Sequence, residues 1–320
     1  MPADDGKTLD ANVAAALKVG DVLLMLGHGE LSKLIAWCGD SIYSHAAIVA
    51  DRGELIEAAA PSARRYSLAR RVADSAEYYF IDAFRPLAND GGALNDADRT
   101  AVLAHAQSLL GVPFPVDRLA TLGVLVAVRG KWPQHWLARL LVREALDHLV
   151  REDPSHMVCS EVVYRSLAEC DVQPRGRLAP RIVMAATTDE PFPVVDWKAL
   201  WDEVWPLLHP ARQTTLAAVA AQVSKPNSAP MAMATMPADL QLSDDDMQRS
   251  LAAARTMLGI DTTLPNTAND NGALLREAVA GAPETVLSNP NPKLVTPLDL
   301  AVTPSHLVLG RIMQAPVPPQ

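Results

Sequence analysis

The stretch IYSHAAIVADRGELIEAAA, residues 42–60, decides the fold that the sequence predicts. Two runs rich in Ala, Ile, Leu and Val, near 45–50 and 54–59, flank a short polar tip that contains a glycine. Apolar runs on both sides of such a tip predict a β-hairpin. Each predicted strand also carries one ionisable residue among its apolar neighbours, His45 in the first and Glu57 in the second.

The register of the hairpin decides whether these two residues meet. A hairpin centred on Asp51 sets His45 directly opposite Glu57, and one centred on Arg52 sets them diagonally on the same face. Either register lets the carboxylate reach the imidazole. A slip by one residue points the two side chains to opposite faces, and another group must then orient His45.

A cysteine at the start of a predicted helix adds a third member to a candidate site. Cys159 lies in the first turn of the helix expected over 155–170, where the helix dipole favours a thiolate and free N–H groups can hold an oxyanion. A thiol nucleophile needs a base, usually histidine, and the base needs a polar group that orients it. Cys159, His45 and Glu57 supply these three residue types.

The same residues also have ordinary structural explanations. Free cysteines are among the most buried residue types, and most of them are inert. A histidine in a strand is often hydrogen-bonded in a core or at its rim. Glu57 could equally face solvent at the edge of a sheet, so sequence spacing permits the site without requiring it.

The first half of the chain alternates strand and helix patterns. Further strands are predicted at 19–26 and 78–84. Helices are predicted at 12–18, 29–39, 94–111, 136–150 and 155–170, and Asn95 is the predicted N-cap of the third of them. The segment 119–142 joins an apolar run to basic and Trp residues. It forms either buried core helices or a surface that contacts a membrane or roofs an acyl pocket.

The composition changes after Trp205, because no Phe, Tyr or Trp occurs from 206 to 320. Pro, Ala, Ser, Thr and Asn become dense there, which predicts loosely ordered parts with two short helices, near 243–258 and 272–280. Just before this change, three Trp residues form a stripe at helical spacing that either packs on the core or presents a surface to a partner: Trp197, Trp201 and Trp205.

Charge and cysteine content exclude several protein classes. A net charge of −9 argues against a nucleic-acid binder, and we interpret the basic run 63–71 as a solvated arm or strand edge. Three cysteines are not a disulfide framework, which predicts a reducing compartment. The sequence has neither a signal-peptide pattern nor a membrane-spanning run, so we expect a cytoplasmic protein, with export by a signal-less route left open.

Metal and nucleotide motifs are absent from the sequence. It contains no CxxC, HExxH, phosphate loop or GxSxG elbow. Apart from His45, its histidines are scattered: His28, His105, His135, His148, His156, His209 and His306. We therefore expect neither a cofactor nor a metal, and the sequence identifies no protein partner.

Five short motifs occur in an order that resembles a known family. GDVLL, SKLI, YSHAAIV, LIEA and CSEVVYRSL follow one another as in the YiiX/YebB-like proteins, which are circularly permuted NlpC-type papain-like hydrolases akin to the lecithin:retinol acyltransferase group. In the permuted proteins the histidine strand precedes the cysteine helix, as it does here. The resemblance implies an α+β fold in which the cysteine helix packs on an antiparallel sheet.

Residue by residue, the resemblance assigns three roles. It implies Cys159 as nucleophile, His45 as general base and Glu57 as orienting residue. The segment 110–119 is similar to the family's Gly-x-Pro-aromatic segment, although Phe114 stands where Tyr is usual.

A further match predicts the domain organisation. The segment 295–312 resembles the Thr-Pro-x-Asp-Leu segment that normally follows the cysteine helix closely. Because a long stretch intervenes here, we expect an N-terminal extension, a split catalytic domain and a helical then Pro/Ala-rich insertion, with the boundaries 1–18, 19–170 plus 293–313, and 171–292.

These features predict a cysteine hydrolase or acyltransferase that cleaves an amide or ester bond through a thioester. A lipid or acyl substrate is favoured, because the permuted group includes acyltransferases and phospholipases and because 119–142 is apolar. A cell-wall peptidase or amidase is the alternative enzyme. A binding or scaffold protein without catalysis, working through its Pro/Ala-rich insertion, is the alternative of another class.

Overall fold

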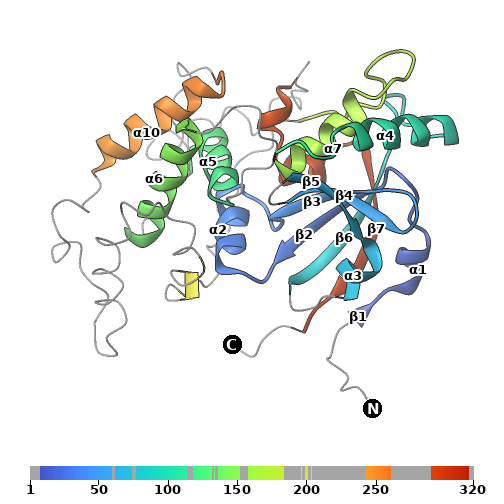
Figure 1. Ribbon diagram of the computed structural model, residues 1–320, viewed down its shortest axis with the longest axis horizontal. Helices are drawn as coiled ribbons and strands as arrows, with labels where there is room; N and C mark the ends of the chain where they lie inside the picture. Colours follow the sequence, from blue (N-terminus) through green and yellow to red (C-terminus); the bar gives the residue numbers. More distant parts are fainter. Residues whose placement is uncertain are drawn as a thin grey trace, which may run out of the picture.

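The computed structural model describes residues 8–59, 62–73, 77–113, 118–131, 133, 136–151, 158–183, 196, 199–200, 203, 243–260 and 290–316. Over these residues the chain forms a mixed α/β structure built around one antiparallel sheet (Figure 1). The sheet has seven strands in the order β1-β7-β6-β2-β3-β4-β5. Their bounds are β1 Thr8–Leu9, β2 Val22–Gly27, β3 His45–Val49, β4 Glu54–Ala59, β5 Ser62–Ser67, β6 Tyr78–Pro86 and β7 His306–Gln314.

The strands predicted from the sequence are present, including both strands of the hairpin. β2 lies at the centre of the sheet, and its side chains alternate between two cores: Leu24 joins one cluster and Leu23 the other. A strand buried on both faces needs a continuous apolar run, which explains the uninterrupted sequence VLLML.

Each face of the sheet is covered by helices. One face packs against α4 (Asp96–Ser108), α7 (Cys159–Ala168) and α12 (Pro297–Val302), and the other against α1 (Ala11–Ala15) and α3 (Leu68–Ala73). The N-cap predicted for α4 is confirmed, because Asn95 forms a capping box with Asp98. The first helix is shorter than the predicted 12–18. It starts one residue earlier because Asp10 accepts the first backbone N–H groups.

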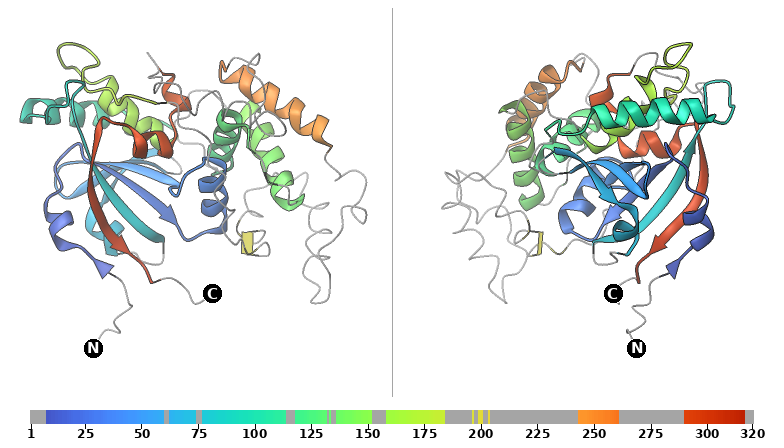
Figure 2. Two further views of the ribbon diagram at one scale, coloured as in Figure 1. Left: turned by 180° about the vertical axis from the view of Figure 1, so that it is seen from behind. Right: turned by 45° about the vertical axis from the view of Figure 1, so that its right-hand side comes forward.

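A third core lies beside the sheet and consists of helices alone (Figures 1 and 2). It is formed by α2 (Glu30–Cys38), α5 (Arg118–Arg129), α6 (Trp136–Arg151) and α10 (Asp244–Met257). The apolar side chains described within 121–127 are buried in it, in agreement with the interpretation of 119–142 as buried helices. The helix predicted near 243–258 is α10, whereas the helix near 272–280 and the three Trp residues of the stripe lie outside the described residues.

The two ends of the chain meet in the sheet. β7 pairs with β6 along its length, and the short β1 pairs with the end of β7, as the blue and red segments in Figure 2 show. The segment before β7 reaches the cysteine helix, because Ser160 Oγ donates to the Val295 carbonyl at 2.6 Å. The segment before β7 therefore shares a core with α7, whereas α1 packs against the opposite face of the sheet. The predicted domain boundaries stay a prediction.

Helices α5 and α6 approach so closely that a glycine is required between them. A Cβ added at Gly123 would lie 2.5 Å from the Ala145 carbonyl oxygen. Helix propensity alone favours alanine by about 1 kcal/mol, but overpacking against backbone costs about 1–3 kcal/mol and should outweigh that gain.

We expect Gly123→Ala to lower the free energy of unfolding in chemical denaturation. Gly92→Ala is the control, because its Cβ would meet only the Asp90 side chain, and equal stability of both variants would contradict this packing.

Candidate active site

The hairpin register brings His45 and Glu57 together. Ile48 pairs with Ile56, which centres the hairpin on Arg52 and places His45 and Glu57 diagonally on one face. His45 Nε2 lies 3.0 Å from Glu57 Oε2. The second of the two registers that the sequence permitted is therefore the one that forms.

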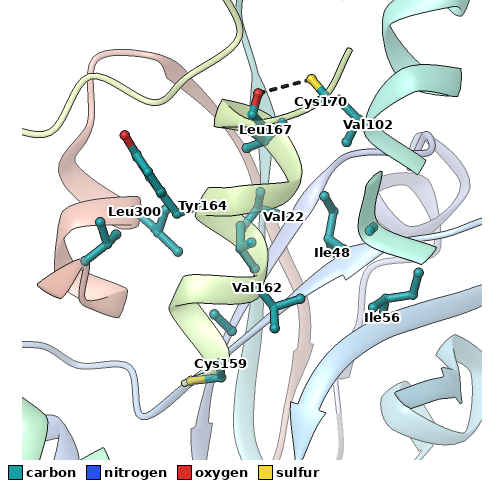
Figure 3. Packing of buried hydrophobic residues seen from close by; sticks show 14 of the residues in the cluster. Val22, Ile48, Ile56, Val102, Cys159, Val162, Tyr164, Leu167, Cys170 and Leu300 are labelled. Carbon is teal, nitrogen blue, oxygen red and sulfur yellow. Dashed lines mark hydrogen bonds between the residues drawn. The ribbon is translucent and has the colours of Figure 1, made fainter. Parts of the chain in front are cut away.

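Cys159 is placed by the first turn of α7. It is the first residue of that helix, as His45 is the first residue of β3, and α7 packs across β3 and β4. The Cys159 sulfur lies close enough to the His45 ring to interact with it electrostatically. Because His45 Nε2 is bonded to Glu57, Nδ1 is the ring nitrogen left for the thiol. Figure 3 shows Cys159 at the end of α7, with Val162 one turn further on.

Two hydrogen bonds hold this first turn of α7 in place. The Val158 N–H donates to Glu161 Oε2 at 3.4 Å, and Ser160 donates to the Val295 carbonyl as described above. Val295 precedes Thr296, which caps α12 in a box with Asp299. The residue beside the nucleophile is thus tied to the segment that returns from the far end of the chain.

Electrostatics favour opposite charges on His45 and Glu57. Burial alone would lower the pKa of His45, but its hydrogen bonds and charge interactions with Cys159 and Glu57 raise it to about 9. Burial alone would raise the pKa of Glu57, but His45, Arg71 and Arg64 lower it to about 2. At neutral pH the pair is an imidazolium facing a carboxylate, which orients the ring toward Cys159.

Two arginines also bind Glu57, and the sequence interpretation missed them. Arg64 donates to Glu57 Oε1 from Nε at 3.2 Å and Nη2 at 3.1 Å, and Arg71 donates to the same oxygen from Nη2 at 2.5 Å. The basic run 63–71 was interpreted as solvated or as a strand edge. β5 is indeed an edge strand, but Arg71 is only 1 % exposed, so that interpretation is wrong for Arg71.

A pairing signal for one of these arginines was present in the sequence. Glu57 and Arg64 are direct partners across β4 and β5, an opposite-charge cross-strand pair. Recognising it requires the β4–β5 pairing as well as the hairpin. Arg71 comes from α3, whose packing against the sheet has no local sequence signature.

The other two cysteines lie in different environments. Burial raises the pKa of the Cys38 thiol far above its usual range, and it raises the pKa of Cys170 to about 11. Cys170 donates to the Leu167 carbonyl at 3.2 Å, as drawn in Figure 3. Both thiols therefore stay protonated at neutral pH, whereas Cys159 lies beside His45 and interacts with its ring.

The described residues contain neither a cluster of metal-ligand side chains nor a membrane-spanning helix. They contain no group of three or more His, Cys, Asp or Glu placed to hold a metal ion. Within the same ranges, every helix is too short or too polar to cross a membrane.

Part of the chain is similar in structure to a metalloprotein of known structure. No family model and no curated protein matches the chain. The crystal structure of metalloprotein yiiX from Escherichia coli O157:H7 is similar over 48 % of this chain and 66 % of its own, with 18 % identity and a TM-score of 0.32. The chain thus spans just under two thirds of that protein. At this TM-score the similarity carries no argument about chemistry.

The ionic contact between His45 and Glu57 predicts a specific dependence of stability on pH. A raised His45 pKa contributes stability that is fully present below 6.5 and lost as pH rises through about 9. The lowered Glu57 pKa contributes stability present above 4.5 and lost as pH falls through about 2. The free energy of unfolding of wild type minus that of His45→Gln should therefore be largest between about pH 4.5 and 6.5. Urea denaturation across pH measures it, and a difference that stays constant from pH 6 to 10 would refute the ion pair.

The three cysteines should differ in reactivity. We expect iodoacetamide to modify Cys159 first at pH 6–7, since it stands beside a candidate base, His45, whereas burial keeps Cys38 and Cys170 protonated. Peptide mass spectrometry over a time course measures the order. Cys170→Ser is the control that should leave the fast phase intact, and equal, slow labelling of all three thiols would favour a protein without a nucleophile.

Proposed function

We propose that the protein is a thiol hydrolase or acyltransferase with a permuted papain-like core, which cleaves an amide or ester bond through a thioester on Cys159. One observation carries the proposal: Cys159, the first residue of α7, interacts with the His45 ring, and His45 Nε2 lies 3.0 Å from Glu57 Oε2. A catalytic triad is recognised by geometry and role: a nucleophile beside a base, and the base beside a group that orients it.

The first half of the reaction forms the acyl-enzyme. His45 holds the proton of Cys159, and the thiolate attacks the substrate carbonyl carbon. The first N–H groups of α7 have no acceptor within the helix, so they can donate to the oxyanion that develops on the carbonyl oxygen. When the tetrahedral intermediate collapses, His45 gives the proton to the departing amine or alcohol, leaving a thioester.

The second half restores the enzyme. Water, or an acceptor alcohol or amine in a transfer reaction, loses a proton to His45 and attacks the thioester carbonyl. Collapse of this intermediate expels the Cys159 sulfur and releases the acid or the transferred acyl product. Throughout, Glu57 stays ionised, because its pKa of about 2 lies far below that of His45.

Chain order and layer order support the papain-like part of the proposal. The histidine strand precedes the cysteine helix in the sequence, and α7 packs on an antiparallel sheet with its first residue at the histidine. This is the arrangement that the resemblance to permuted NlpC-type proteins implies.

Lipid and cell-wall substrates are separated by experiment. A lipid substrate was favoured partly because of the apolar segment 119–142, but the side chains described within 121–127 are buried against other helices. Incubation with phospholipid vesicles and, separately, with muropeptides, followed by mass spectrometry, compares the two substrate classes directly.

Substitution of the nucleophile tests the proposed function. We expect Cys159→Ala to lose activity by about 10⁴-fold or more on whichever substrate is cleaved, while the melting temperature stays close to that of wild type. Cys170→Ala is the control, since that thiol is buried at the other end of α7 and should keep full activity. Turnover retained in Cys159→Ala would end the proposal.

A further inference from the structure

The network of charged side chains continues beyond Glu57. Arg71 donates to Glu57 and, from Nη1, to Glu77 Oε2 at 2.7 Å. Arg71 is among the largest fully buried side chains described, and burying a guanidinium is costly unless it is well paired. A buried cation that touches the orienting residue of the site therefore needs an explanation beyond packing.

The two oxygens of Glu57 have different partners. Oε2 contacts His45, whereas Oε1 accepts from both Arg64 and Arg71. Bonds to Oε1 fix the rotation of the carboxylate group, and this rotation decides whether Oε2 points at His45 Nε2. A firmly held donor to Oε1 can therefore set the direction of the Glu57–His45 hydrogen bond.

Arg71 is the rigid member of the two. Its guanidinium carbon lies 4.2 Å from the ring centroid of Tyr66 and 4.9 Å from that of Tyr78, so aromatic rings as well as Glu77 fix its plane. The Arg64 side chain is 40 % exposed, and its polar and aromatic partners among the described residues are Glu57 Oε1 and the Tyr66 ring.

We propose that Arg71 is a positioning residue for the Cys159–His45 pair and acts through Glu57. It locks the Glu57 carboxylate so that Oε2 holds the His45 ring with Nδ1 facing the thiol. The proposal rests on the proposed function in that it treats this pair as catalytic, but the alignment of the pair can be measured without any substrate.

The test compares Arg71→Met with Arg64→Met by the rate of iodoacetamide labelling of Cys159 between pH 5 and 10. In Arg71→Met the rate at pH 6 should fall about tenfold or more, because the loss of a charge-assisted hydrogen bond misorients His45 and the thiol keeps its proton. At pH 10 the rate should match wild type, since the thiol then ionises without help. Arg64→Met should change the rate at pH 6 by less than about threefold, as expected for an exposed partner.

Two further variants keep the test decisive. Arg71→Lys retains the charge if Arg71→Met does not fold, but an ammonium cannot present a planar fork to Glu57 and Glu77 together, so the loss at pH 6 should persist. In a Glu57→Gln background, Arg71→Met should change the labelling rate by less than about twofold. Arg71 acts on His45 through the Glu57 carboxylate, and that carboxylate is already absent.

Several results would overturn the positioning role. One is a wild-type rate of Cys159 labelling at pH 6 in folded Arg71→Met or Arg71→Lys. Another is a labelling rate that Arg71→Met lowers equally at pH 6 and pH 10. A third is a labelling rate that Arg71→Met lowers as much in the Glu57→Gln background as in wild type. Wild-type Cys159 no faster than Cys170 at pH 6 would also overturn it, since there would be no pair to position. A reactive, Arg71-dependent Cys159 without hydrolysis of any substrate would overturn the proposed function alone.

Discussion

A carboxylate that is fully removed from solvent, Glu57, is the constraint on which the rest of the site depends. A buried anion is tolerated only when cations and hydrogen-bond donors surround it. Here His45, Arg64 and Arg71 all donate to it. Because these donors come from β3, β5 and α3, satisfying one charge fixes how two strand pairs and a helix are placed around the candidate base.

The nucleophile is positioned by a different part of the chain. α7 lies over the hairpin, and its first turn is anchored where Ser160 reaches the Val295 carbonyl. The thiol and the imidazole belong to elements more than a hundred residues apart, and each stands first in its own element. The apolar side chains packed between α7 and the sheet keep the first residue of α7 beside the first residue of β3.

Local patterns were enough to predict β2, β3, β4, β6 and several helices, and to single out the three candidate site residues, since each has a short-range physical signature. They did not predict β1, β5 or β7. The hairpin was predicted from its apolar runs and α4 from its Asn95 cap. Cys159 was singled out by its place in the first turn of an amphipathic helix. Two registers of the hairpin remained open, because both of them place Glu57 beside His45. Arg71 could not be predicted, because its burial depends on α3 packing beside Tyr66 and Tyr78, a tertiary contact without a local pattern.

The central claim is that His45 is held as an imidazolium between Cys159 and Glu57. The most direct measurement is an NMR titration of the ¹³C- and ¹⁵N-labelled His45 ring, assigned by comparison with His45→Gln. The account predicts a pKa of about 9 in the wild-type protein, with both ring nitrogens protonated at neutral pH. A titration near the ordinary value of 6.5 would contradict it.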